Sequence, residues 1–225
     1  MSLKSTRTLG DKVFTACYNY TNTIGARNVY EFLALFRFWR LYMAVYAITC
    51  ESSGPFPAPG MNNEATMLTS IRIVTCPQNK PIAAGFFTRS DGQTVASRYN
   101  AITDEMCKGR PSFESAVPKL KGFISNPDNI FLCFGNGYYE QLLLRYGIKG
   151  KFVDLLPAAR DLMARSANIN NPSGSGGAKI PKIAELAEWL GFDNPVMPED
   201  KAKLICETAL WIKAEQNNTA MGRMS

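Results

Sequence analysis

The chain has 225 residues, of which 46% are hydrophobic and 20% are charged, and these proportions exclude a wholly disordered protein. Its formal charge of +6 favours a polyanionic partner, because lysine and arginine release condensed counterions when they bind phosphates. Histidine is absent, so the chain has neither the usual general base near neutral pH nor the commonest metal ligand. The length predicts one domain with extensions.

The cysteines and the hydropathy profile indicate a cellular compartment. Six cysteines are scattered without a C-x-x-C pair and lie mostly in apolar segments, as reduced core residues do. The longest apolar run, 41–48, is far shorter than the roughly 20 residues that a membrane-spanning helix requires. We therefore expect no membrane partner and an intracellular, reducing location, with the cytoplasm as the leading choice and the mitochondrion as the alternative.

The first 42 residues are predicted to form an extension outside the main domain. Residues 1–27 carry four lysine or arginine side chains and one acid, which predicts a basic arm. A mitochondrial presequence is the alternative, although the stretch lacks an arginine-rich amphipathic helix. After it, 28–42 is unusually aromatic, and a helix that begins at Asn28 places Phe32, Phe36 and Trp39 on one face.

That aromatic helix has two interpretations. It packs on its own domain, or it docks onto another subunit, because so much aromatic surface is unfavourable in water. In the second interpretation the partner-binding residues are Phe32, Phe36, Arg37, Trp39 and Arg40.

The next stretch, 42–54, is the one around which the rest of the chain is organised. Its apolar residues predict a buried central strand, and the strand stops at Glu51 and a Ser52-Ser53-Gly54 turn. The crevice beyond the strand ends is where α/β sheets usually place their ligands, so Glu51 is a candidate functional residue. Two further strands, 67–75 and 82–88, complete a predicted antiparallel meander.

The remainder alternates between helices and strands. Amphipathic patterns and capping residues predict strands over 129–134 and 152–156, a polar loop over 166–179, and helices over 103–109, 112–124, 138–146, 157–164, 182–190 and 200–214. The polar end, 215–225, is predicted to fray. This order predicts a ribonuclease H-like fold, in which three antiparallel strands are followed by parallel strands and helices cover both faces of one mixed sheet.

Several short motifs follow one another in this framework. The first is Thr49-Cys50-Glu51-Ser52-Ser53-Gly54, and the later ones are 102–106 (ITDEM), 109–113 (GRPSF), 135–140 (GNGYYE), 154–156 (DLL), 186–192 and 200–206 (DKAKLIC). In order and spacing they resemble the DnaQ-like (DEDD) 3′–5′ exonuclease superfamily, whose domain would cover 43–214. In that family the first strand ends in Asp-x-Glu-Thr-Thr-Gly, the second motif is His-Asn-x-x-Phe-Asp and the last is His-x-Ala-x-x-Asp-Ala.

The resemblance implies a catalytic site with degenerate positions. These exonucleases hold two divalent metals with four carboxylates. The corresponding positions here are Thr49, Glu51, Glu140 and Ile205, with Asp200 at the position of the general base. A threonine hydroxyl and an isoleucine cannot balance two dications, so the resemblance implies at most one weakly held metal, on Glu51, Glu140 and Asp154.

Other acids in the chain could compensate for the missing metal ligands. Asp154, Glu199, Asp200 and Glu207 are the candidates to compensate for the lost carboxylates. Glu207 is two residues beyond the lost aspartate, which turns it about 200° around a helix and onto the wrong face. If the site is dead, two close anions remain in it, and Glu51→Gln is expected to raise stability by relieving their repulsion.

The leading hypothesis is therefore a degenerate, non-catalytic protein with the exonuclease fold that binds nucleic acid or protein as a subunit of a larger assembly. The resemblance implies that nucleic acid would contact Ser52, Ser53, Asn136 and Tyr139. No cofactor is expected under this hypothesis. The alternative is an active 3′–5′ exonuclease on single-stranded RNA or DNA that uses Mg²⁺ or Mn²⁺ in a rebuilt site. The sequence therefore leaves open whether the chain is an enzyme.

Overall fold

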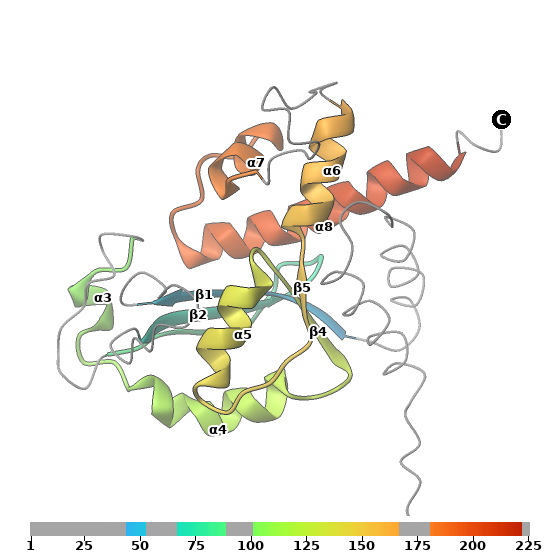
Figure 1. The fold of residues 1–225 in the computed structure, drawn as a ribbon. Coiled ribbons are helices and arrows are strands. Elements are labelled where there is room, and N and C mark those ends of the chain that lie inside the picture. The colour runs from blue at the N-terminus through green and yellow to red at the C-terminus, as the bar shows by residue number, and fades with distance from the viewer. Residues whose placement is uncertain (1–43, 53–66, 89–100, 167–180, 222–225) are drawn as a thin grey trace, which may run out of the picture. The chain divides into compact units, whose positions relative to one another are not determined.

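Five strands form one mixed sheet at the centre of the fold, in the order β3-β2-β1-β4-β5 (Figure 1). This computed structural model describes residues 44–52, 67–88, 101–166 and 181–221. The predicted basic arm and aromatic helix lie outside these ranges, as does nearly all of the predicted polar loop. The architecture confirms the predicted ribonuclease H-like sheet, with helices on both of its faces.

The first three strands form the predicted antiparallel meander. β1 (Ala44–Ser52) pairs antiparallel with β2 (Leu68–Thr75), which pairs antiparallel with β3 (Pro81–Phe86). Most of β1 and β2 is buried because both faces of these strands are covered. The register between β1 and β2 shifts between Glu51 and Ser52, at the end of the central strand.

The second half of the sheet is parallel. β4 (Asn129–Cys133) is buried throughout and pairs in parallel with β5 (Phe152–Asp154). Between them lies α5 (Asn136–Leu144), which begins at Asn136 and not at Tyr138 as predicted. Gly135 precedes it with a φ of 79°, a left-handed conformation that glycine adopts without strain, and this allows the chain to turn directly from the strand into the helix.

The remaining helices largely follow the sequence patterns. They are α3 (Asp104–Cys107), α4 (Phe113–Ile124), α6 (Leu156–Ser166), α7 (Ile183–Trp189) and α8 (Pro198–Met221). The hydroxyl of Thr103 accepts a hydrogen bond from the Met106 amide at 3.4 Å, so Thr103 caps the helix that was predicted to start at this residue. The fraying expected from residue 215 is wrong as far as Met221, because no glycine or proline interrupts the helix before that point.

Helices cover the two faces of the sheet in separate groups (Figure 1). Apolar side chains of α4 and α5, such as Phe113, Ile124 and Leu142, belong to one buried cluster with Ile48 of β1 and Phe131 of β4. On the other face α8 packs against β2 and β4, and α6 packs on α8. In the part of the chain that the structure describes, no helix combines the length and apolar character that crossing a membrane requires.

A substitution of Phe131 can test whether β4 lies at the centre of the core. Its side chain is fully buried, and its ring centre lies 5.6 Å from that of Tyr46 and 5.8 Å from that of Phe123. We expect Phe131→Ala to lower the free energy of unfolding by about 3–5 kcal/mol, measured by urea denaturation, because it removes apolar contacts and leaves a cavity. Ile82→Ala, on the exposed edge strand β3, is the control and is expected to cost less than about 1 kcal/mol. Equal losses in the two variants would contradict a central β4.

Candidate site at the end of the central strand

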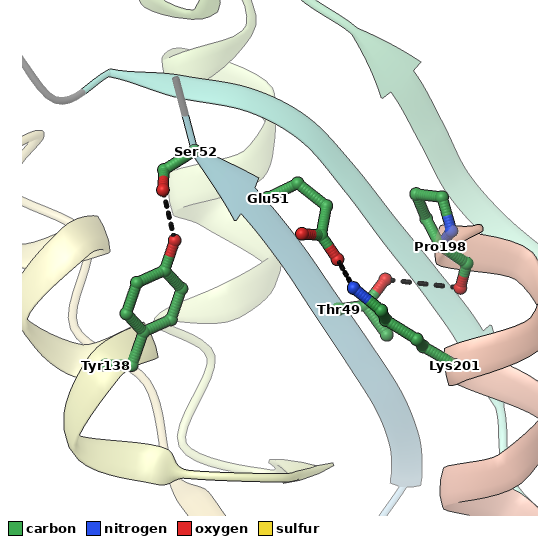
Figure 2. Close-up of polar contacts among 6 residues, drawn as sticks. All are labelled: Thr49, Glu51, Ser52, Tyr138, Pro198 and Lys201. Carbon is green, nitrogen blue, oxygen red and sulfur yellow. Dashed lines mark hydrogen bonds and ion pairs between the residues drawn. The ribbon is translucent and has the colours of Figure 1, made fainter. Parts of the chain in front are cut away.

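The last residues of β1 point alternately to the two faces of the sheet. Figure 2 shows Thr49 and Glu51 directed toward the first turn of α8, and Ser52 directed toward α5 on the opposite face. This alternation follows from the pleat of a β-strand, in which neighbouring side chains leave opposite sides. The end of β1 therefore contacts a helix on each face.

On the α8 face, Glu51 forms an ion pair with Lys201. The Lys201 Nζ atom lies 2.5 Å from the Glu51 Oε1 atom, and the two side chains are 19% and 12% exposed (Figure 2). Thr49 adds a second link, because its hydroxyl donates to the Pro198 carbonyl oxygen at 3.4 Å. A tethered ammonium group therefore contacts the one carboxylate that the first motif retains.

A second ion pair lies on the same face, one strand away. Arg72 of β2 is opposite Thr49 in the antiparallel register, so both side chains leave the same side of the sheet. Its NH1 atom lies 2.9 Å from the Glu199 Oε1 atom. Glu199, one of the acids that could have compensated for a lost carboxylate, is thus paired with a base of its own.

The other candidate acids have separate surroundings. Glu140 is half-buried on α5, and desolvation by burial raises the pKa of its carboxyl group. The Asp154 Oδ1 atom accepts hydrogen bonds from the backbone amides of Gly135 and Leu156, both at 3.0 Å, so it organises two loop ends. Asp200 is exposed in the first turn of α8.

Glu207 lies on the wrong face, as the helical geometry predicted. It is close enough to Cys76 to contribute, after a hydrogen bond with Cys206, burial, and the charge of Cys206, to the raised pKa of the Cys76 thiol. Cys76 follows β2, and its amide donates to the Val45 carbonyl oxygen at the other end of β1 from Glu51. Glu207 therefore takes no part in the site around Glu51.

The two positions that the resemblance aligned with aspartates are buried. Thr49 and Ile205 both have no exposed surface, and Ile205 packs in the interior with Ala202 and Ala209 of the same helix also buried. Within the described ranges, no three aspartate, glutamate, cysteine or histidine side chains come together in a group that could hold a metal ion. Burial raises the pKa of the neighbouring thiols of Cys50 and Cys133, which disfavours the thiolate form that binds metals.

The residues expected to contact nucleic acid fall into three groups. Ser52 is nearly buried, and its hydroxyl accepts a hydrogen bond from the Tyr138 hydroxyl at 2.6 Å (Figure 2). Tyr139 packs in the core, so a contact between its ring and a ligand would require that side chain to rearrange. Ser53 and the side chain of Asn136 lie outside the described residues, as do the five partner-binding candidates in 28–42.

Sequence reasoning missed four participants in this site: Arg72, Tyr138, Pro198 and Lys201. Tyr138 and Lys201 each lie within one of the motifs. They are next to Tyr139 and Asp200, which the sequence analysis named as site residues. Only that proximity could have singled them out. Arg72 alternates with apolar residues in a predicted strand, and such a residue is expected to be a solvated side chain.

Comparison with known proteins shows which solved structures have a similar fold. No family model matches the chain, and neither does any curated protein sequence. Solved structures do match. E. coli exonuclease I in complex with a 5cy-dT13 oligonucleotide has a TM-score of 0.57 at 15% identity, over 79% of this chain and 41% of exonuclease I. The ExoI/SSB-Ct complex has a TM-score of 0.58 at 14% identity, over 79% of this chain and 42% of the other.

A third similar structure is a 3′-exonuclease that recognises the 3′ end of the histone mRNA stem-loop. It has a TM-score of 0.50 at 11% identity, over 94% of this chain and 81% of that one. At such identities the likeness shows the fold alone, and the chain spans about two fifths of the length of exonuclease I. The chain therefore has a fold like that of exonuclease I, as its motifs suggested.

The ion pair between Glu51 and Lys201 reverses one expectation drawn from the sequence. We expect Glu51→Gln and Lys201→Met each to lower the free energy of unfolding, the second by about 2 kcal/mol, a value between those of exposed and fully buried pairs. Urea denaturation of both variants and the double variant gives the coupling energy, which we expect to be about 1–2 kcal/mol. Lys119→Met, an exposed lysine on α4, is the control. A rise in stability with Glu51→Gln would instead support two repelling anions.

Proposed function

We propose that this chain is a non-catalytic protein with the exonuclease fold that binds single-stranded nucleic acid, and that it works as a subunit of a larger assembly. The observation that carries the proposal is the contact between the Lys201 ammonium group and the Glu51 carboxylate. In the family that the motifs resemble, the carboxylate of this strand is a metal ligand. Here the same carboxylate has a covalently tethered cation as its partner.

The residues around this position do not fit a pair of divalent metals. Two-metal hydrolysis uses one ion to activate water and another to stabilise the leaving oxygen, and hard anionic oxygens hold both ions. Thr49 and Ile205 supply no charge, while the Oδ1 atom of Asp154 already accepts from two backbone amides. An ammonium group carries one positive charge and has no open coordination position for water. These features favour binding without bond cleavage.

Two observations support nucleic acid as the ligand. Exonuclease I, which has a similar fold, has been solved with an oligonucleotide bound, and the present chain carries a formal charge of +6. A positively charged protein gains affinity for nucleic acid by releasing counterions from the phosphates. The rival function, an active 3′–5′ exonuclease, is favoured by the activity named for the similar structures.

A digestion assay separates the two functions. We expect the protein to bind a 5′-labelled oligothymidylate or oligouridylate and to leave it full length in Mg²⁺ and in Mn²⁺, because Thr49 and Ile205 offer no charge to a second metal. Glu51→Gln is the control, and we expect it to give the same gel pattern. A ladder of shortened products that disappears with Glu51→Gln would establish the exonuclease and refute our proposal.

The same samples give a second measurement that does not depend on activity. If Lys201 excludes divalent cations from Glu51, added Mn²⁺ leaves the melting temperature of the protein unchanged. A metal that bound the folded state would raise the melting temperature through mass action. A Mn²⁺-dependent rise in the unaltered protein that is lost with Glu51→Gln would show that a cation displaces Lys201.

The assembly part of the proposal rests on the sequence of residues 1–42. The basic arm is expected to add phosphate contacts, and the aromatic helix is expected to bind a protein partner through residues such as Trp39. We expect deletion of 1–27 to leave the melting temperature unchanged and to weaken oligonucleotide binding. A plot of log affinity against log salt concentration has a negative slope. Each lost phosphate contact should make this slope less steep by about 0.7 for a single strand. An unchanged slope would remove the arm from the binding surface.

A further inference from the structure

The two ion pairs at the end of the sheet differ in how firmly they are held. Glu51 and Lys201 are mostly covered, whereas Glu199 is 44% exposed and is the most accessible of the four side chains. Glu199 also belongs to the first turn of α8, so its carboxylate can turn toward water without moving the helix. The pair that it forms with Arg72 is therefore the one that an incoming anion could exchange.

Arg72 has hydrogen-bonding capacity that Glu199 does not use. One oxygen of Glu199 accepts from the NH1 atom, and the Arg72 Nε atom is buried without a hydrogen-bond partner among the described residues. The hydroxyl of Ser70 is likewise buried and without a partner in that part of the chain. Ser70 lies opposite Glu51 as Arg72 lies opposite Thr49, so both face the first turn of α8.

Buried donors without acceptors are rare and call for a physical explanation, such as an ion or ligand that binds there. A guanidinium group presents its N–H donors as a planar fork, which matches the several oxygens of a phosphate better than a single carboxylate oxygen does. The neighbouring β-strand irregularity at Glu51 and Ser52 is also a feature that often occurs beside binding sites. The polar groups on this face thus suit an anion with more than one acceptor atom.

The local charge favours the exchange of Glu199 for an incoming anion over the addition of an anion to the intact ion pairs. Arg72 and Lys201 balance Glu51 and Glu199, so the closed arrangement attracts no anion. When Glu199 turns away, Arg72, Lys201 and Glu51 together carry one net positive charge. Asp200 is the other acid in this turn, and it is exposed to solvent, where its charge is screened.

We propose that Arg72 binds a phosphate group of a single-stranded nucleic acid, and that Glu199 is a displaceable carboxylate that occupies Arg72 until the phosphate arrives. This inference rests on the proposed nucleic-acid binding and specifies its anchor. It also gives this face of the sheet a way to hold a phosphodiester without metal ions. No bond is made or broken, because the step is an exchange of one anion for another.

The test compares two charge-neutralising changes on the same helix. Glu207 is eight residues beyond Glu199, about 12 Å along the helix axis, which exceeds the screening length of about 10 Å at 0.1 M salt. We measure binding of a fluorescein-labelled oligothymidylate by anisotropy, at 0.1 M salt with a chelator present. We expect Glu199→Gln to raise affinity about two- to fivefold, the factor for releasing an exposed ion pair. Glu207→Gln is expected to leave the affinity nearly unchanged.

Arg72 variants complete the experiment. We expect Arg72→Met to lower affinity about tenfold, as loss of a charge-assisted hydrogen bond does, and to cancel the gain of Glu199→Gln in the double variant. Arg72→Lys keeps the positive charge and loses the planar fork of donors. Its affinity is expected to lie between that of the unaltered protein and that of Arg72→Met. Melting temperatures of all variants identify any that fail to fold.

Two results would overturn this inference alone. One is an equal gain with Glu199→Gln and Glu207→Gln, which would reflect net charge only, and the other is unchanged affinity in a folded Arg72→Met or Arg72→Lys variant. If neither the unaltered protein nor Glu199→Gln binds oligothymidylate or oligouridylate, the inference and the proposed function fail together.

Discussion

The carboxylate of Glu51 requires a cation, and the way in which this requirement is met determines the rest of the site. A mostly covered carboxylate is costly to leave unpaired, because the surrounding protein solvates its charge poorly. Lys201 meets the requirement from the first turn of α8, and Thr49 fixes the same turn through the Pro198 carbonyl. The central strand and the long C-terminal helix are therefore joined where the resembled family would place metal ions.

Burial favours neutral side chains at positions 49 and 205, near the ion pair of Glu51. A carboxylate at position 205 would lie in a fully buried environment, and isoleucine removes that cost while filling the space. Thr49 carries a neutral hydroxyl that finds a backbone acceptor. With fewer anions in the site, a single ammonium group is enough to balance Glu51.

The two faces of β1 have different physical characters. On the α5 face, Ser52 and Tyr138 form a neutral hydrogen bond above an apolar cluster that includes Ile48 and Cys50. On the α8 face, two ion pairs lie side by side on neighbouring strands, one more exposed than the other. The first face is therefore apolar and closely packed, whereas the second carries paired charges, of which Glu199 is the most exposed.

The sequence alone determined the element order, the fold and the likeness of the motifs, because these depend on local patterns. The apolar run before Glu51 and the cap at Thr103 act within a few residues, so they are legible in the chain. Which acid meets which base was decided only by the tertiary structure. Lys201 is 150 residues from Glu51, and Glu199 is 127 residues from Arg72. No local pattern encodes such pairs, because strand register and the packing of α8 bring them together.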